Sequence, residues 1–165
     1  MNAQSSLQPI LDDLAKRFGS QIEETRRLNQ NEVYLHTKME FVPGLCGYFY
    51  RKQAGRLVSI FAEDERERSG CYFVRYVFAL DSAHAFFCLR IPISTGQPEF
   101  TSLTNAVHAV NWQEREIQDL FGLKLIGHPN PRRCALHDDW PEVFPLRKDF
   151  DLRTQLPPFT GERHK

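Results

Sequence analysis

The chain has 165 residues, with 21 Lys and Arg against 21 Asp and Glu, so its formal net charge is zero. This length suits one domain with a sizeable core. Hydrophobic residues make up 41% and charged residues 25% of the chain, an ordinary globular composition that argues against disorder. A neutral chain gives no electrostatic reason to expect nucleic acid or an anionic membrane surface as a partner.

Targeting and cysteine patterns indicate the cell compartment. The N-terminal stretch M-N-A-Q-S-S-L-Q-P has neither the basic nor the apolar region of a signal peptide. No uncharged apolar run approaches the length of a membrane span. The four cysteines form no C-x-x-C pair, which argues against iron–sulfur or zinc ligation. We therefore expect a soluble cytoplasmic protein with reduced thiols.

The first third of the chain predicts a helix, two strands and a second helix. Apolar residues recur at helical spacing over residues 5–19, and Gly19 is a plausible stop. Residues 21–28 and 32–38 are typical of two short strands joined by a turn. Residues 39–55 favour a helix with Pro43 near its start, weakened by two internal glycines.

The middle of the chain predicts most of a sheet. Residues 56–62 alternate as a strand does, and the charged stretch 63–70 is expected to be an exposed connection. Residues 71–80 and 85–93 are β-rich runs whose short separation favours a hairpin. Both runs are apolar at nearly every position, which predicts a sheet covered on both faces.

The last third begins with a loop over 95–102 and a helix over 111–121, with Asn111 as N-cap and Gly122 as its stop. Six prolines follow from residue 129 onward and preclude long regular structure. The fold class is therefore α+β: an N-terminal helix and a mixed β-sheet packed with helices, then an irregular Pro- and charge-rich C-terminal segment. Residues 1–150 form one domain, and 151–165 form a tail.

The stretch W-Q-E-R-E-I-Q-D-L-F-G, residues 112–122, carries the densest charge. On a helical wheel started at Trp112, Glu116 falls about 40° round, inside the apolar arc, whereas Arg115 and Asp119 fall on the opposite face. We therefore expect a solvated Arg115–Asp119 pair and an inward Glu116. A buried carboxylate needs a partner, and the available guanidinium groups belong to Arg132, Arg133 and Arg147.

Chemical alternatives to this structural or interface role remain open. Glu114 and Glu116 could act as an acid/base pair assisted by His128 or His137, although residues two apart on a helix point about 160° away from each other. A metal site would use His128, His137, Asp138 and Asp139, whose spacing matches no helical ligand pattern. A redox-sensing role would use Cys46 or Cys71.

Three ordered motifs, E-R-E-I-Q-D-L-F-G, G-H-P-N-P-R-R and F-P-L-R-K-D-F, resemble those of the thirty-kilodalton subunit family of respiratory complex I. The stretches D-D-W-P-E-V-F-P-L-R-K-D and L-V-S-I-F-A-E-D-E-R are more similar to the related domain of group 4 membrane-bound hydrogenases and formate hydrogenlyase. The chain would then be a stand-alone subunit or an excised domain. Cys134 and Ala135 depart from the bulkier aliphatic residues expected there.

The resemblance implies a non-catalytic assembly or docking subunit with no cofactor of its own. Its partners would be a large subunit, either nickel–iron hydrogenase-like or of a quinone module, and a neighbouring iron–sulfur subunit. It would lie at the cytoplasmic inner face of the cell membrane, held there only through the complex, and would bind no nucleic acid. The motif and interface positions carried over are Glu114, Arg115, Glu116, Asp119, Gly127, His128, Arg132, Arg133, Asp138, Asp139, Arg147, Lys148 and Asp149.

Overall fold

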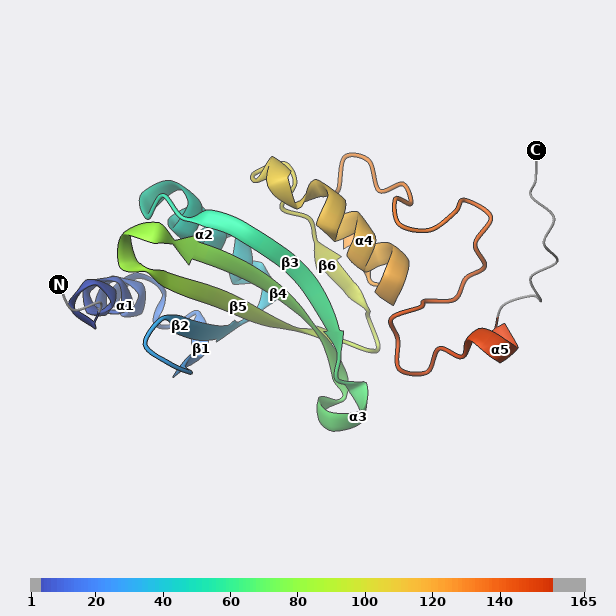
Figure 1. Cartoon of the computed structure of the whole chain (residues 1–165), viewed down its shortest axis with the longest axis horizontal. Coiled ribbons are helices and arrows are strands. Elements are labelled where there is room, and N and C mark those ends of the chain that lie inside the picture. Colours follow the sequence, from blue (N-terminus) through green and yellow to red (C-terminus); the bar gives the residue numbers. More distant parts are fainter. Residues whose placement is uncertain (1–3, 156–165) are drawn as a thin grey trace.

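The computed structural model describes residues 4–155. The elements, in chain order, are α1 (Gln4–Phe18), β1 (Ile22–Arg27), β2 (Glu32–Thr37), the 3-10 turn η1 (Met39–Phe41), α2 (Val42–Gly47), the π-helical turn η2 (Tyr48–Lys52), β3 (Arg56–Asp64), α3 (Arg66–Ser69), β4 (Cys71–Leu80), η3 (Asp81–Ala83), β5 (Ala85–Ser94), β6 (Glu99–Thr101), η4 (His108–Val110), α4 (Asn111–Phe121), β7 (Lys124–Ile126) and α5 (Leu152–Gln155). After β7 the chain runs as a long irregular segment to α5 (Figure 1). The α+β class, the first helix, the first two strands and the hairpin are confirmed.

A mixed five-stranded sheet forms the centre, in the order β1-β2-β5-β4-β3. The β1–β2, β4–β5 and β3–β4 pairs are antiparallel, whereas β2 and β5 are parallel. The parallel pair needs a long crossover, and the chain from η1 through β4 supplies it. A second sheet pairs β6 with β7 in parallel. Neither of its three-residue strands was predicted, because each is too short to show a period.

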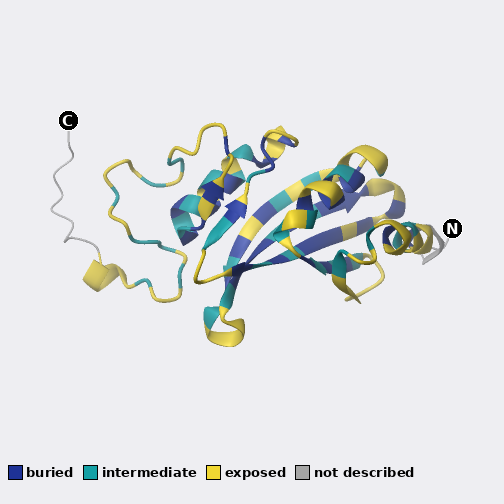
Figure 2. Cartoon of the chain, turned by 180° about the vertical axis from the view of Figure 1, so that it is seen from behind, coloured by how far each residue is buried: buried dark blue, intermediate teal, exposed yellow. Residues whose placement is uncertain are grey.

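One face of the main sheet carries the hydrophobic core. Every second residue of β5 is buried, and Phe87, Leu89 and Ile91 are fully buried. From the covering helices, Phe49 packs with its ring centroid 5.0 Å from that of Phe87 and 5.3 Å from that of Phe78. Figure 2 shows burial concentrated in the strands and helices, whereas the C-terminal segment is largely exposed or intermediate. The core thus lies between the sheet and its helices.

The prediction of a sheet covered on both faces is wrong. Arg75 and Arg90 lie on the second face with side chains 13% and 23% exposed, and Phe61 and Phe86 there are 40% and 46% exposed. The strand sequence has apolar residues on this face as well, and Phe73 is one of them. Phe73 is buried under the Arg90 guanidinium, whose carbon lies 3.2 Å from the ring centroid, and not under a second layer of helices. A long arginine stem covers apolar surface as an aliphatic residue would.

The charged stretch 63–70 is also less exposed than predicted. Strand β3 continues to Asp64, whose carboxylate is buried. Short helix α3 follows and ends at Gly70 with a left-handed φ of 74°. Glu63 and Glu65 pair with Arg75 and Arg90 of the sheet. The stretch therefore connects the sheet to other parts of the fold. Among residues 4–155, no helix is long and apolar enough to cross a membrane.

Candidate functional site

Helix α4 holds the first motif and ends as predicted at Gly122, with φ of 65°. Asn111 is its first residue and not its N-cap, since Val110 precedes the first turn without a side-chain cap. The buried side of the helix carries Ile117 and Phe121. On a wheel, these two lie about 40° apart, and Glu114 lies about 20° beyond Phe121. Glu114 is therefore the carboxylate drawn into the core.

Three neutral donors satisfy the fully buried Glu114 carboxylate. Its Oε2 accepts from the Ser102 hydroxyl at 2.6 Å and from the Thr104 hydroxyl at 2.7 Å. Its Oε1 accepts from the backbone N–H of Leu103 at 2.7 Å. Hydrogen bonds to a charged group are the stronger kind. Glu114 thus fastens α4 to the loop after β6 without any arginine.

The prediction that Glu116 faces inward is wrong, because Glu116 is exposed. A helical wheel that starts at Trp112 places the buried arc around this ring, but Trp112 is 66% exposed. When the buried arc of the wheel is centred on Ile117 and Phe121, which are buried, Glu116 falls outside it. No arginine among the described residues forms a salt bridge with Glu116. Of the expected partners, Arg133 bonds to the Trp140 carbonyl and to Glu142, and Arg147 bonds to the Phe121 carbonyl.

Arg115 and Asp119 do not pair with each other, which overturns the second geometric prediction. Arg115 donates from Nε to the carbonyl of Arg132 at 2.7 Å and from Nη2 to that of Arg133 at 3.0 Å. Asp119 is buried and accepts from the backbone N–H groups of Cys134 and Ala135 at 2.7 and 2.9 Å. The outer side of α4 therefore binds the backbone of the segment 132–135, and that segment buries Asp119.

The third motif holds the other end of α4. Arg147 donates from Nε to the carbonyl of Phe121 at 2.6 Å and lies 4.2 Å from the Phe144 ring centroid. The backbone N–H of Leu146 donates to the carbonyl of Leu120 at 3.0 Å. The last carbonyls of a helix lack intrahelical donors, so the C-terminal segment supplies them. A Cβ at Gly122 would lie 2.5 Å from the Phe144 ring, which leaves room only for glycine.

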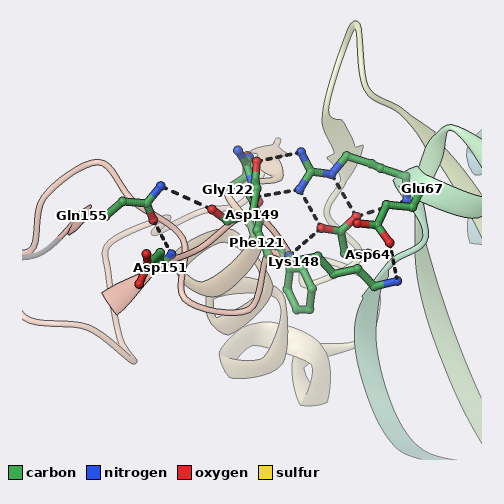
Figure 3. A network of polar contacts seen from close by, with 10 residues as sticks. Asp64, Glu67, Phe121, Gly122, Lys148, Asp149, Asp151 and Gln155 are labelled. Atoms are coloured by element: carbon green, nitrogen blue, oxygen red, sulfur yellow. Dashed lines mark hydrogen bonds and ion pairs between the residues drawn. The ribbon is translucent and has the colours of Figure 1, made fainter. Parts of the chain in front are cut away.

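A network of carboxylates and one guanidinium joins the same segment to the sheet (Figure 3). Arg66 bonds to Asp64 at 2.7 Å and to Asp149 at 2.8 Å, and the backbone N–H of Lys148 donates to Asp64 at 3.0 Å. The hydrogen bond from Arg66 holds the pKa of the Asp64 carboxyl well below its usual range. Arg66 of α3 thereby links Asp64 of β3 to Asp149 of the C-terminal segment.

The remaining predicted residues lie along the segment between these attachments. Arg133 donates to the carbonyl of Trp140 at 3.1 Å and to Glu142 at 3.0 Å. His128 is buried, with its Nδ1 accepting from the N–H of Asn130 at 3.0 Å. Gly127 has φ of 78°, a value that favours glycine. Arg132, Asp138 and Asp139 are exposed.

The chemical alternatives find no support in this arrangement. Glu114 is enclosed and Glu116 is exposed, so the two carboxylates share no site. Within residues 4–155, no three His, Cys, Asp or Glu side chains are placed to hold a metal, so the alternative set of His128, His137, Asp138 and Asp139 is not brought together. Burial raises the pKa of the Cys46 thiol, which disfavours the reactive thiolate, whereas Cys71 is half-buried.

Several residues of the site were missed from the sequence. The sequence indicates a solvated loop around Asp64 and Arg66 and an ordinary loop at Ser102, and it gives no signal for Thr104. Gln118 also contributes, since its Nε2 donates to the carbonyl of Pro131 at 2.9 Å. For Asp64 a signal exists: it continues the alternation of β3 on the core side, two residues after Ala62.

Apolar side chains lie exposed beside the attachments. Trp112 is 66% and Leu146 is 52% exposed. A shallow hollow of about 280 Å³ between α4 and β3 is lined by Phe61, Leu120 and Leu146, among others. Phe61 and Leu146 share this hollow, whereas Trp112 is not part of its lining. Exposed large apolar groups that gather at one place mark interaction surfaces. Arg115, Asp119 and Arg147 thus bond inside the fold, whereas Trp112 and Leu146 next to them leave apolar surface exposed.

The fold and the site define a small α+β domain whose charged motifs fix an irregular C-terminal segment onto a helix and a sheet edge. Residues 35–156 match the family model of the respiratory-chain NADH dehydrogenase 30 Kd subunit. The chain belongs to that family.

One curated relative is formate hydrogenlyase subunit 5 of Escherichia coli strain K12, which is 37% identical over 79% of this chain and 24% of the relative. Another is hydrogenase-4 component G of the same organism, which is 35% identical over 97% of this chain and 30% of the relative. The C/D subunit of NADH-quinone oxidoreductase from Methylococcus capsulatus is 31% identical over 92% of this chain and 27% of the relative. The chain thus spans between about a quarter and a third of these relatives' length. The relatives are subunits of multisubunit oxidoreductases, as the resemblance implied.

Two solved structures share the fold. The trypsin-resistant fragment of Nqo5 superposes with a TM-score of 0.62 at 19% identity, covering 76% of this chain and 98% of that one. A chain of the membrane-bound sulfane sulfur reductase, an archaeal respiratory membrane complex, gives 0.74 at 16% identity, covering 88% and 85%.

Proposed function

We propose that this chain is a non-catalytic docking subunit of a membrane-associated multisubunit oxidoreductase, either hydrogenase- or formate hydrogenlyase-like or an NADH:quinone oxidoreductase. The relatives named as formate hydrogenlyase and hydrogenase-4 components support the first type. The relative from NADH-quinone oxidoreductase supports the second. In this proposal the chain touches the large subunit of the electron-transfer arm and a neighbouring iron–sulfur subunit, and it carries no cofactor of its own.

One observation carries the proposal: three motif charges, Arg115, Asp119 and Arg147, bond to the chain's own backbone, and large apolar groups are exposed beside them. Arg115 and Asp119 hold residues 132–135, and Arg147 holds the end of α4. These bonds order the irregular segment, which lowers its conformational entropy. The segment can then present a fixed surface. A surface fixed in advance binds with less ordering cost.

The contact surface in this proposal centres on Trp112 and Leu146. Anchors of interfaces are typically large apolar or aromatic groups surrounded by a polar rim. The exposed motif residues with polar side chains would supply that rim: Glu116, Arg132, Asp138, Asp139, Lys148 and Asp149. The complex as a whole would hold the chain at the cytoplasmic face of the membrane.

Substitution of the exposed apolar anchors tests the proposal. Trp112→Asp and Leu146→Asp should each release the chain from its complex on a native gel, because a charge is placed at the centre of the contact. Both variants should keep the wild-type melting temperature, since the two side chains are exposed. Tyr50→Asp is the matched control, being 46% exposed at η2, and should leave assembly intact. An intact and active complex in cells lacking the chain would overturn the proposal.

A further inference from the structure

The second face of the main sheet carries a row of side chains that runs across all its strands. Backbone register places Glu24 of β1 beside His36 of β2, and His36 beside Arg90 of β5. The row continues to Arg75 of β4 and Phe61 of β3. All five line one hollow of about 460 Å³ on this face. In Figure 1, β3, β4 and β5 run side by side between α1 and α4.

Two arginines at the middle of this row are direct cross-strand partners. Arg75 and Arg90 face each other in the antiparallel β4–β5 pair. Like charges directly opposite each other destabilise a sheet, so folding alone does not favour this pair. Each guanidinium is instead offset by an acid further along the face: Arg75 bonds to Glu63 at 2.7 Å and Arg90 to Glu65 at 3.0 Å.

Both guanidinium groups are fixed in position and keep unused donors. Arg90 lies 3.2 Å from the Phe73 ring centroid, and Arg75 lies 5.5 Å from that of Tyr34. A guanidinium has five N–H groups. Among the described residues, Arg75 uses two of its N–H groups, to Glu63 and to the Cys88 sulfur. Arg90 uses one N–H group, to Glu65. The rest are available to an acceptor that enters the hollow.

The rim of the hollow adds to its positive charge. Arg26 and Arg68 line it and are exposed. The lining contains four arginines against three glutamates, Glu24, Glu63 and Glu65. Two of those glutamates pair with Arg75 and Arg90, so Arg26 and Arg68 stand against Glu24 alone and the hollow keeps a formal excess of one positive charge. A planar guanidinium with spare donors binds carboxylates through two parallel hydrogen bonds.

The length of the row distinguishes a protein segment from a small anion. Five strands at about 4.8 Å spacing span roughly 19 Å from β1 to β3, which matches about six residues of extended chain. Apolar groups stand at both ends of the hollow, with Phe61 and Leu28 40% and 50% exposed. An extended segment with central carboxylates and apolar flanks would complement both features.

We propose that the open sheet face, centred on Arg75 and Arg90, binds an extended acidic segment of another protein subunit. The inference rests on the proposed function in that the segment belongs to a partner in the same complex. It assigns that partner a second contact, which adjoins the surface around Leu146 at Phe61.

The test uses the full chain and a blocked hexaglutamate peptide, with binding followed by calorimetry and by backbone NMR. Hexaglutamate should shift the resonances of β4 and β5, and its affinity should fall as salt rises. Arg90→Gln should weaken binding about tenfold, since it removes charge-assisted hydrogen bonds. Arg153→Gln, a substitution of an exposed arginine on α5, is the matched control and should bind like the wild type.

A second variant guards against misfolding of Arg90→Gln. The rim substitutions Arg26→Gln and Arg68→Gln together affect only exposed side chains, so they should weaken binding several-fold at an unchanged melting temperature. Equal binding of blocked hexaglutamine, competition by inorganic phosphate at the same concentration, or equal loss in Arg153→Gln would each overturn the inference. Because the readout is peptide binding to the isolated chain, its failure leaves the assembly test of the proposed function standing.

Discussion

Replacing Glu114 by alanine should destabilise the fold far more than replacing its neighbour Glu116. Glu114 is fully buried and accepts from Ser102, Leu103 and Thr104. Its removal leaves these donors without an acceptor, and each buried unsatisfied group costs about 1–3 kcal/mol. The terms are not additive, so we expect a total loss of roughly 3–5 kcal/mol. This is a large fraction of the 5–15 kcal/mol typical of a domain.

The assay is urea unfolding of both variants at equal temperature, with the free energy of unfolding taken by linear extrapolation. Glu116→Ala should lie within about 0.5 kcal/mol of the wild type, as exposed substitutions do. The pair is matched because both change one glutamate on the same helix. Equal losses in the two variants would refute the assignment of the buried carboxylate to Glu114. A larger loss of stability in Glu116→Ala than in Glu114→Ala would show that Glu116 is the buried carboxylate.

Three further changes test the attachments of the C-terminal segment. Arg147→Ala removes the donor to the end of α4 and should cost about 1.5–3 kcal/mol in urea unfolding, whereas the exposed Arg153→Ala should cost almost nothing; equal values would contradict the attachment. Gly122→Ala should destabilise the fold by about 1–3 kcal/mol, because φ is 65° and the new Cβ meets the Phe144 ring. An unchanged melting temperature would show that the Phe144 segment is not held against Gly122. The folded pKa of Asp64 lies below its usual value, so its stabilisation is present above about pH 3.9 and is lost as pH falls through the folded pKa. Acid unfolding of Asp64→Asn should therefore show a weaker loss of stability below about pH 5 than the wild type does, and identical acid transitions would count against the link to Arg66.

The regular elements were predictable because their patterns are local. Helix α1, strands β1 to β5 and the end of α4 at Gly122 follow from periodicity and from a single glycine stop. Strands β6 and β7 were missed because each has three residues and is defined by its partner. Local sequence carries no information about such a distant pairing.

The site was harder to predict because its contacts are made to backbone atoms far along the chain. A helical wheel gives relative angles but needs one residue known to be buried, and the large apolar Trp112 is exposed. Asp119 faces away from the core and is buried only because the backbone of Cys134 and Ala135 covers it. The sequence could identify the charged residues involved but could not show that their partners are amides and carbonyls.

The central claim is that the first motif fastens the C-terminal segment to α4. Hydrogen exchange of the Cys134 and Ala135 amides tests this most directly, because both donate to Asp119. In Asp119→Ala these two amides should lose their protection, while the amides of β4 and β5 keep theirs. Unchanged protection at Cys134 and Ala135 in that variant would contradict the claim.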